Sequence, residues 1–193
     1  MHADIDAALC GATPCPKGRA WLVETGHGPV AAYNHAPNGA WIAWGCSKRP
    51  MTAERLRRLV AVGALFARAV LQLVSEKHRE VCARGVDFAE RYGRGESIDR
   101  AAAGTAAARV ANIAWPANNY GGSQDEWAAR AAAWAARAAW AAADEFSEWT
   151  AADIAAGVAD AADIASGYGL GGYVKLPSAD DVRAILGPPE AWL

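Results

Sequence analysis

The sequence has no strong excess of either charge. Its 19 lysines and arginines stand against 21 aspartates and glutamates, which gives a formal net charge of −2 at pH 7. A chain this close to neutral has no overall field that would gather nucleic acid or an anionic membrane unless a local patch supplies one. Sequence-independent binding to DNA is therefore disfavoured.

Long apolar runs are also missing. The longest, residues 59–74, contains Arg68, and it is shorter than the ~20 apolar residues that span a bilayer. The first six residues have neither the basic start nor the apolar stretch of a secretory signal. We therefore expect a cytoplasmic protein that is not exported and has no contact with a membrane.

Cysteine is scarce as well, since four cysteines in 193 residues are too few for a disulfide scaffold. Three of them fall in the first fifty residues, where His27 and His35 also lie, so a structural zinc site is an alternative to be weighed: Cys10, Cys15, Cys46, His27 and His35. The Cys10–Cys15 spacing is slightly too wide for the commonest zinc pair, and no second tight pair supports it. We predict no metal and reduced thiols that are mostly buried.

Sequence motifs of catalysis are absent too. The chain contains no G-x-S-x-G, H-E-x-x-H, Walker or kinase pattern, and the glycines of residues 167–172 follow no predicted strand. His78 lies on an apolar helix face, which favours a core histidine. Asp153 and Asp160 share a helix face, where a solvated acidic stripe is the better interpretation than a carboxylate pair. The sequence therefore predicts no enzyme and no cofactor.

Alanine and tryptophan are what the chain has in abundance. Residues 127–143 consist of alanine, three tryptophans and two arginines only, and alanine has the highest helix propensity. Ser123 and Glu126 have the spacing of a capping box, so we predict a helix over residues 124–145. A bare alanine face can only be filled by a closely approaching neighbour, which predicts short distances between helix axes.

Capping residues and apolar periodicity predict further helices. They lie over residues 52–74, with an amphipathic face, and over 76–92, 98–115 after Ser97 and before Pro116, 150–166 after Ser147 or Thr150, and a short segment between Ser178 and Gly187. Residues 98–166 should form a sheaf of three alanine-lined helices, against which the helix at 52–74 packs. For the first fifty residues short irregular helices are favoured, and a small hairpin is the alternative.

These expectations define the fold class as all-α, a compact multi-helix bundle with alanine-rich, closely packed helices. The length suits one domain. We predict short irregular helices in residues 1–50, the main bundle in 52–166, and a glycine-rich loop with a short C-terminal helix in 167–193.

One helix face combines aromatic and basic residues. At 100° per residue, two arginines of the helix at 124–145 fall in a narrow stripe together with Glu126 and Asp144. The stripe is flanked by two tryptophans on one side and one on the other. The tryptophans either seal the edges of the bundle or form an exposed patch of the composition enriched in binding hot spots. The candidate contact residues are Trp127, Arg130, Trp134, Arg137 and Trp140.

Several local patterns resemble a known family, the Imm-5-like immunity proteins, which are alanine-rich helical proteins of phage and bacterial genomes. The resemblance covers residues 8–146. It rests on Cys15-Pro16-x-Gly18 with Trp21-Leu22, Gly39-Ala40-Trp41-Ile42-x-Trp44, Arg55-Leu56-Arg57-Arg58-Leu59, Phe88-Ala89-Glu90-Arg91-Tyr92-x-x-Gly95-Glu96 and the alanine and tryptophan tract. It implies a helical fold, a cytoplasmic setting and a role in toxin neutralisation or phage–host conflict, and it assigns no catalytic or binding residue.

Together these observations favour a non-enzymatic protein that binds and blocks a partner protein, as immunity or phage counter-defence factors do. One alternative is a small-molecule binder or sponge that holds a nucleotide between aromatic and arginine side chains. A second alternative is a structural homo-oligomer, assembled through the alanine face or the tryptophans.

Overall fold

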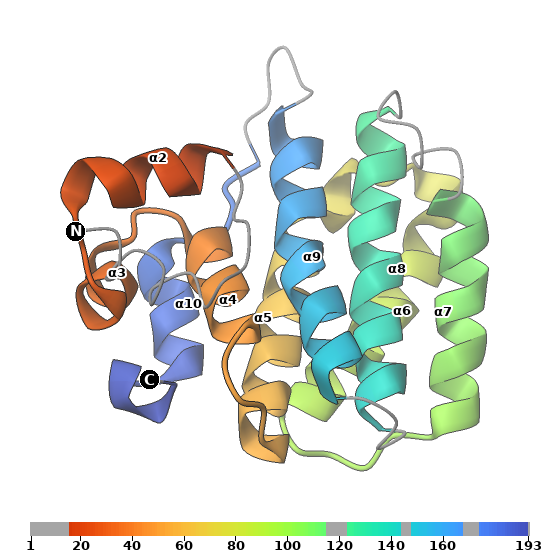
Figure 1. The fold of residues 1–193 in the computed structure, drawn as a ribbon. Helices are drawn as coiled ribbons and strands as arrows, with labels where there is room; N and C mark the ends of the chain where they lie inside the picture. Colours follow the sequence, from red (N-terminus) through yellow and green to blue (C-terminus); the bar gives the residue numbers. More distant parts are fainter. Residues whose placement is uncertain (1–15, 115–122, 144–147, 168–173, 193) are drawn as a thin grey trace.

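The computed structural model describes residues 16–114, 123–143, 148–167 and 174–192, and every regular element in these ranges is helical (Figure 1). The predicted all-α fold is therefore confirmed. The α-helices are α2 (Pro16–Thr25), α3 (Pro29–His35), α4 (Gly39–Ser47), α5 (Ala53–Val70), α6 (Glu76–Gly93), α7 (Arg100–Ala114), α8 (Gln124–Ala142), α9 (Glu148–Gly167) and α10 (Ala179–Leu186), with 3-10 helices η1 (Leu71–Leu73) and η3 (Pro189–Ala191).

Helix α8 lies between α7 and α9. Figure 1 shows α7, α8 and α9 side by side, and α8 contacts both neighbours as well as α5 and α6 on its other side. We call α7, α8 and α9 the alanine sheaf. Helix α5 packs against α8 and α9, so the predicted support of the sheaf by this amphipathic helix is confirmed.

Small side chains let the helices approach closely, as predicted. Every buried residue of α8 other than Trp127 is an alanine. A Cβ atom on Gly63 of α5 would lie 3.1 Å from the backbone oxygen of Ala155 in α9. A Cβ atom on Gly85 of α6 would lie 3.2 Å from the Cβ of Ala136 in α8. These separations leave no room for larger residues at the crossing points, because interiors are packed as densely as crystals.

Several helix boundaries differ from the prediction. Helix α8 ends at Ala142, three residues before the predicted end, and α9 begins at Glu148, so Thr150 lies inside the helix and is not its cap. Helix α5 ends at Val70, and the chain continues to Leu73 as the 3-10 helix η1 instead of as α-helix. Helix α7 begins at Arg100 because Asp99 is its cap, the carboxylate accepting a hydrogen bond from the Ala102 N–H at 3.1 Å. The prediction of Ser97 as the cap is therefore wrong. Pro116 and Ser147, expected at other helix ends, lie outside the described residues.

The caps of α8 and α10 are confirmed. Ser123 and Glu126 form the predicted capping box, with the Ser123 N–H donating to the Glu126 carboxylate at 2.6 Å. Ser178 and Asp181 form a second one at the start of α10. At the end of α10, Gly187 adopts a left-handed φ of +83°, which glycine tolerates without strain.

The N-terminal part is helical where it is described. Helices α2, α3 and α4 are the short helices that the sequence favours, and residues 16–50 contain no strand, so the hairpin alternative is wrong. The glycine-rich loop falls mostly on residues 168–173, outside the described ranges. Within the described ranges no helix combines the length and apolarity needed to cross a membrane.

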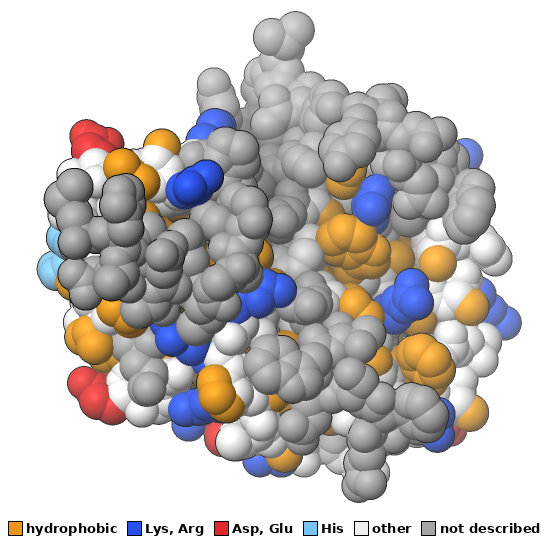
Figure 2. Space-filling view, viewed as in Figure 1, with side chains coloured by type: hydrophobic (Ala, Val, Ile, Leu, Met, Phe, Trp, Pro, Cys, Tyr) orange, Lys and Arg blue, Asp and Glu red, His pale blue; other side chains and the backbone are white. Residues whose placement is uncertain are grey.

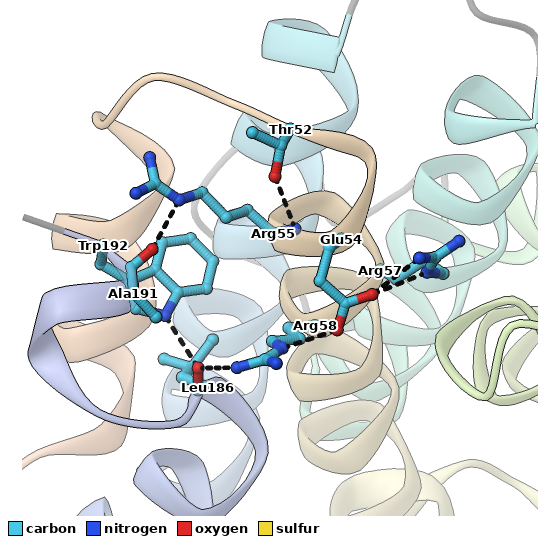
Figure 3. Close-up of polar contacts among 8 residues, drawn as sticks. All are labelled: Thr52, Glu54, Arg55, Arg57, Arg58, Leu186, Ala191 and Trp192. Carbon is cyan, nitrogen blue, oxygen red and sulfur yellow. Dashed lines mark hydrogen bonds and ion pairs between the residues drawn. The ribbon is translucent and has the colours of Figure 1, made fainter.

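Long polar side chains fasten the C-terminal segment to the rest of the molecule (Figure 3). The Arg55 Nε donates to the backbone oxygen of Ala191 at 2.6 Å, and the Arg58 Nη1 donates to that of Leu186 at 2.7 Å. Trp192 is 1% exposed, and its indole N–H also donates to the Leu186 oxygen, at 2.9 Å. Arg58 and Trp192 thus satisfy a carbonyl at the end of α10, where helix carbonyls have no partner within the helix. Arg55 binds the last carbonyl of η3.

The same segment is tied to α3. Arg183 donates to the backbone oxygens of Tyr33 and Ala36, at 3.0 and 2.7 Å, and so caps the C-terminal end of α3. The Tyr33 hydroxyl donates to the Gly187 oxygen at 2.6 Å. Burial raises the pKa of Tyr33 well above its ordinary value, so this hydroxyl stays protonated and remains a donor. We call Tyr33, Arg55, Arg58, Arg183 and Trp192 the C-terminal clamp.

Candidate functional site

A groove of about 950 Å³ runs between α7 and α8. It lies within the volume range of ligand pockets, which is roughly 300–1,000 Å³. Its lining residues are Arg100, Ala101, Gly104, Thr105, Ala107, Ala108 and Ala111 from α7, and Arg130, Ala133, Trp134, Arg137 and Trp140 from α8. We call it the α7–α8 groove. Figure 2 shows hydrophobic and basic side chains interspersed over this part of the surface.

Two glycines hold the groove tryptophans in place. The Trp140 ring reaches across to α7, where a Cβ atom on Gly104 would lie 3.1 Å from the indole Nε1. The Trp134 ring leans the other way, and a Cβ atom on Gly157 of α9 would lie 2.7 Å from its Cζ3. Each indole therefore has a neighbouring helix that is shaped to receive it, and the two arginines of the stripe lie between them.

Arg130 is held by aromatic rings. Its guanidinium carbon lies 4.9 Å from the ring centroid of Trp127 and 4.6 Å from that of Trp134. Both distances are within the range of a cation–π interaction, which is about 6 Å or less. The two rings are three residues before and four residues after Arg130 on the same helix, so the arrangement follows from helical spacing. Arg130 is a positioned positive charge at one end of the groove.

Arg137 is an exposed cation of the groove. Its side chain makes no hydrogen bond or ion pair with any described residue. Arg100, from the first turn of α7, adds a third guanidinium, and no aspartate or glutamate is among the described lining residues. The described lining of the groove therefore holds three guanidiniums and no carboxylate, although the whole chain is slightly acidic.

The five candidate contact residues divide into two groups. Arg130, Trp134, Arg137 and Trp140 come together in the groove, whereas Trp127 is 4% exposed and belongs to the main core. The Trp127 indole N–H has no hydrogen-bond partner among the described residues. Trp127 is therefore not an exposed contact residue. It affects the groove by holding Arg130, whose guanidinium lies over its ring.

The sequence prediction missed the α7 wall. Arg100, Gly104 and Thr105 line the groove opposite the tryptophans, and none of them was a candidate. Gly104 does carry a signal, because a glycine inside an alanine-rich helix lowers helix stability and is placed where something approaches closely. The residue that approaches Gly104 is Trp140, thirty-six positions further along the chain.

The zinc candidates do not assemble in the described part of the chain. Cys10 and Cys15 lie outside it, and no group of three or more metal-ligating side chains occurs within it. The imidazoles of His27 and His35 do meet, with ring centroids 5.3 Å apart. Cys46 is a buried thiol of the core, with a pKa raised far above its ordinary value by burial.

Two of the remaining candidates, Cys82 and His78, have side chains that the structure describes. Cys82 is free and buried, as predicted, and burial raises its pKa to about 12. His78 is half-buried. The side chains of Asp153 and Asp160 lie outside the described part of the structure. Among the described lining of the groove, Thr105 is the one hydroxyl, and it donates to the backbone oxygen of Ala101 at 2.9 Å.

No protein-family model, curated protein or solved structure matches this chain. The resemblance to Imm-5-like immunity proteins therefore stays a prediction. The residues of the groove therefore have to indicate what it can bind. The Arg137 guanidinium offers planar, two-pronged donors to carboxylates or phosphates, and two indoles with a floor of small residues offer apolar surface. The groove suits an anionic ligand that also has an apolar face.

Proposed function

We propose that the chain is a non-enzymatic binding protein that recognises an acidic surface of a partner protein with the α7–α8 groove. The observation that carries this proposal is the combination, in one groove, of three arginines and two tryptophans with no acidic side chain in the described lining. Arginine and tryptophan are the residue types most enriched among interface hot spots. Positive charges gathered in one groove attract an oppositely charged partner and speed its association.

The biological role that fits this activity is neutralisation of a toxin or of a defence factor. Support comes from the resemblance of residues 8–146 to Imm-5-like immunity proteins and from the rigid, capped helices that present the groove. An inhibitor of this kind needs a preformed surface more than it needs catalytic groups, since its effect is to block the partner by occupying it.

A nucleotide ligand is the second candidate, because the groove volume falls within the small-molecule range. An arginine could hold its phosphates and an indole its base. This candidate differs from the first in one measurable way: a nucleotide should raise the thermal unfolding temperature of the isolated protein, since a ligand that binds only the folded state stabilises it.

A charge reversal in the groove tests the proposal. Arg137→Glu should reduce partner capture at least about tenfold, because a desolvated charge pair would be replaced by a repulsive one. Arg109→Glu is the matched control, since Arg109 is an exposed arginine of α7 that does not line the groove. The two variants change the net charge equally.

The measurement is affinity capture from the native cell with wild type, Arg137→Glu and Arg109→Glu as parallel baits, read by mass spectrometry. A protein retained by wild type and Arg109→Glu but lost with Arg137→Glu supports the proposal. Circular dichroism of all three baits should be the same. Identical captured proteins for all three baits would mean that the groove is not the contact surface.

A further inference from the structure

Two histidines meet near α2 and α3, on the opposite side of the molecule from the α7–α8 groove (Figure 1). His27 lies in the connection between α2 and α3, and His35 is the last residue of α3. The centres of their imidazole rings are 5.3 Å apart, and the ring planes make an angle of 41°. Neither imidazole has a hydrogen bond or an ion pair with another described residue. The described part of the chain therefore leaves their ring nitrogens available for a ligand.

The local sequence directs the chain so that the two rings converge. Gly26 adopts a left-handed φ of +64° directly after α2, a conformation that glycine takes without strain and that ends a helix. Gly28 is the N-cap of α3, and Pro29 lies in the first turn of that helix, where a proline removes no helical hydrogen bond. His27 is thus fixed between two glycines, and His35 follows eight positions later, at the other end of α3.

Aromatic contacts hold His27 in place. The Trp21 ring of α2 lies edge-on to the His27 imidazole, with 5.4 Å between the ring centres. Trp21 in turn contacts the ring of Trp41 in α4, at 5.9 Å. Both indoles and His27 are half-buried, whereas His35 is exposed. The histidine pair is therefore anchored on its protein side and accessible to a ligand from solvent.

The separation of the rings fits two ligands of one tetrahedral metal ion. A bond from Zn²⁺ to a histidine nitrogen is about 2.0–2.1 Å long, and this nitrogen lies about 1.1 Å from its ring centre, so each ring centre would lie about 3.2 Å from the metal. At the tetrahedral angle of about 109°, two such ring centres would be about 5.2 Å apart. At the angle of about 90° in octahedral sites they would be about 4.5 Å apart. The observed 5.3 Å agrees with the tetrahedral arrangement.

Helix α2 has few buried contacts that a metal ion would have to compete with. Among its described side chains, Leu22 is the one apolar residue that is buried. Leu22 belongs to a small cluster with partly buried neighbours from α2, α3 and α4, separate from the main core. A metal ion held by His27 and His35 would tie the end of this helix to α3, whose Tyr33 belongs to the main core. A site that exists only in the folded state adds its binding free energy to folding.

We infer that His27 and His35 bind one Zn²⁺ ion, each through one ring nitrogen. Imidazole suits Zn²⁺, Cu²⁺ and Ni²⁺, and tetrahedral geometry favours Zn²⁺ among them. Two further positions of the tetrahedron are left for water or another ligand. The sequence predicts no metal because the pairing of two histidines eight positions apart becomes visible only in the fold. This inference is independent of the α7–α8 groove and of the proposed function.

A zinc titration tests the site in the full chain. Metal-free wild type, His27→Gln, His35→Gln and His78→Gln are each titrated with Zn²⁺ in competition with a chromophoric chelator. His78 is the matched control, because it is a half-buried histidine of α6. Wild type and His78→Gln should bind Zn²⁺ equally. His27→Gln and His35→Gln should bind it at least about tenfold more weakly, since each loses one of the two protein ligands.

Cobalt reports the geometry of the same site. Tetrahedral Co²⁺ absorbs visible light much more strongly than octahedral Co²⁺, so wild type and His78→Gln should give an intense visible band that the other two variants lack. Zn²⁺ should also raise the thermal unfolding temperature of wild type, because it binds the folded state. Circular dichroism checks that each variant is folded. A further measurement needs no variant: Zn²⁺ should shift the imidazole signals of two of the four histidines in nuclear magnetic resonance spectra.

Three outcomes would overturn the inference. The first is wild-type protein that binds no Zn²⁺, and the second is equal Zn²⁺ affinity in all four proteins. The third is a weak, octahedral Co²⁺ spectrum of the wild type, which would contradict the geometry on which the site depends. Because the groove takes no part in these measurements, none of the three outcomes bears on the capture of a partner protein.

Discussion

The alanine sheaf and the C-terminal clamp hold helices together by opposite means. In the sheaf the contacts are made by residues with almost no side chain, and α8 is buried through alanines alone apart from Trp127. In the clamp a few long side chains reach across to backbone oxygens of other segments (Figure 3). The alanine sheaf depends on side chains small enough for the helices to touch, and the C-terminal clamp depends on side chains long enough to reach backbone oxygens of other segments.

This difference also assigns the arginines to separate tasks. Arg55, Arg58 and Arg183 are occupied in capping helix ends and holding the chain terminus. Positive charge near the last carbonyls of a helix is favourable, so these side chains stabilise the fold. Arg137 has no such structural contact among the described residues. An arginine that the fold does not need is available for a ligand.

Removing a large side chain from the clamp should have the largest effect on stability. Trp192→Ala should lower the free energy of unfolding by about 3–5 kcal/mol, because it deletes a fully buried indole. The measurement is urea unfolding followed by circular dichroism. Trp192→Phe is the control that keeps a ring but loses the hydrogen bond to Leu186, and it should cost less. If Trp192→Ala left the free energy of unfolding nearly unchanged, the clamp would contribute little to folding.

Adding atoms should damage the sheaf in the same assay. Ala132→Leu should lower the free energy of unfolding by about 1–3 kcal/mol, since it overpacks a fully buried position of α8. Ala101→Leu, at an exposed position of α7, is the matched control and should change stability by less than about 0.5 kcal/mol. Equal effects of the two variants would contradict close packing in the sheaf.

The smallest loss of stability is expected for the capping boxes, a motif that both regions use. Ser123→Ala in the sheaf and Ser178→Ala next to the clamp each remove the serine of a capping box, and each should cost about 1 kcal/mol. A clearly larger loss for Ser178→Ala would show that the short helix α10 depends on its cap more than on the clamp. Chemical unfolding of both variants at pH 7 makes the comparison.

The second capping box adds a dependence on pH. Hydrogen bonds from the Ser178 side chain and backbone lower the pKa of Asp181 below its ordinary value. A carboxylate with a lowered pKa in the folded state stabilises the fold fully above its unfolded pKa, near 3.9, and loses this effect as the pH falls through the folded value. The stability difference between wild type and Asp181→Asn should therefore shrink below about pH 4.

Much of the fold could be predicted because it depends on local rules. The Ser123 and Ser178 caps follow from spacing alone, and alanine content predicts both the helical state of α8 and its close packing. The end of α5 could not be predicted, because nothing in the local sequence separates an α-helix at Val70 from a 3-10 turn that continues to Leu73. Local composition also does not decide whether Ser97 or Asp99 caps α7.

The candidate site was only half predictable for a related reason. Trp127 and Trp134 lie within about 20° on the helical wheel, yet one is in the core and the other lines the groove. What separates them is the neighbouring helix, since Trp134 lies against Gly157 of α9. Arg100 was missed because its place opposite α8 depends on how two helices pair, which periodicity within one helix does not reveal.

The stacking of Arg130 against Trp127 and Trp134 bears on the entropy and kinetics of binding. A guanidinium held at 4.6 and 4.9 Å from two rings has already lost much of the rotamer freedom that a surface arginine must give up on complex formation. Arg137 keeps that freedom in solution and can first attract a partner from a distance. We therefore expect Arg137 to govern the salt dependence of the association rate, and Arg130 to govern how long the complex lasts.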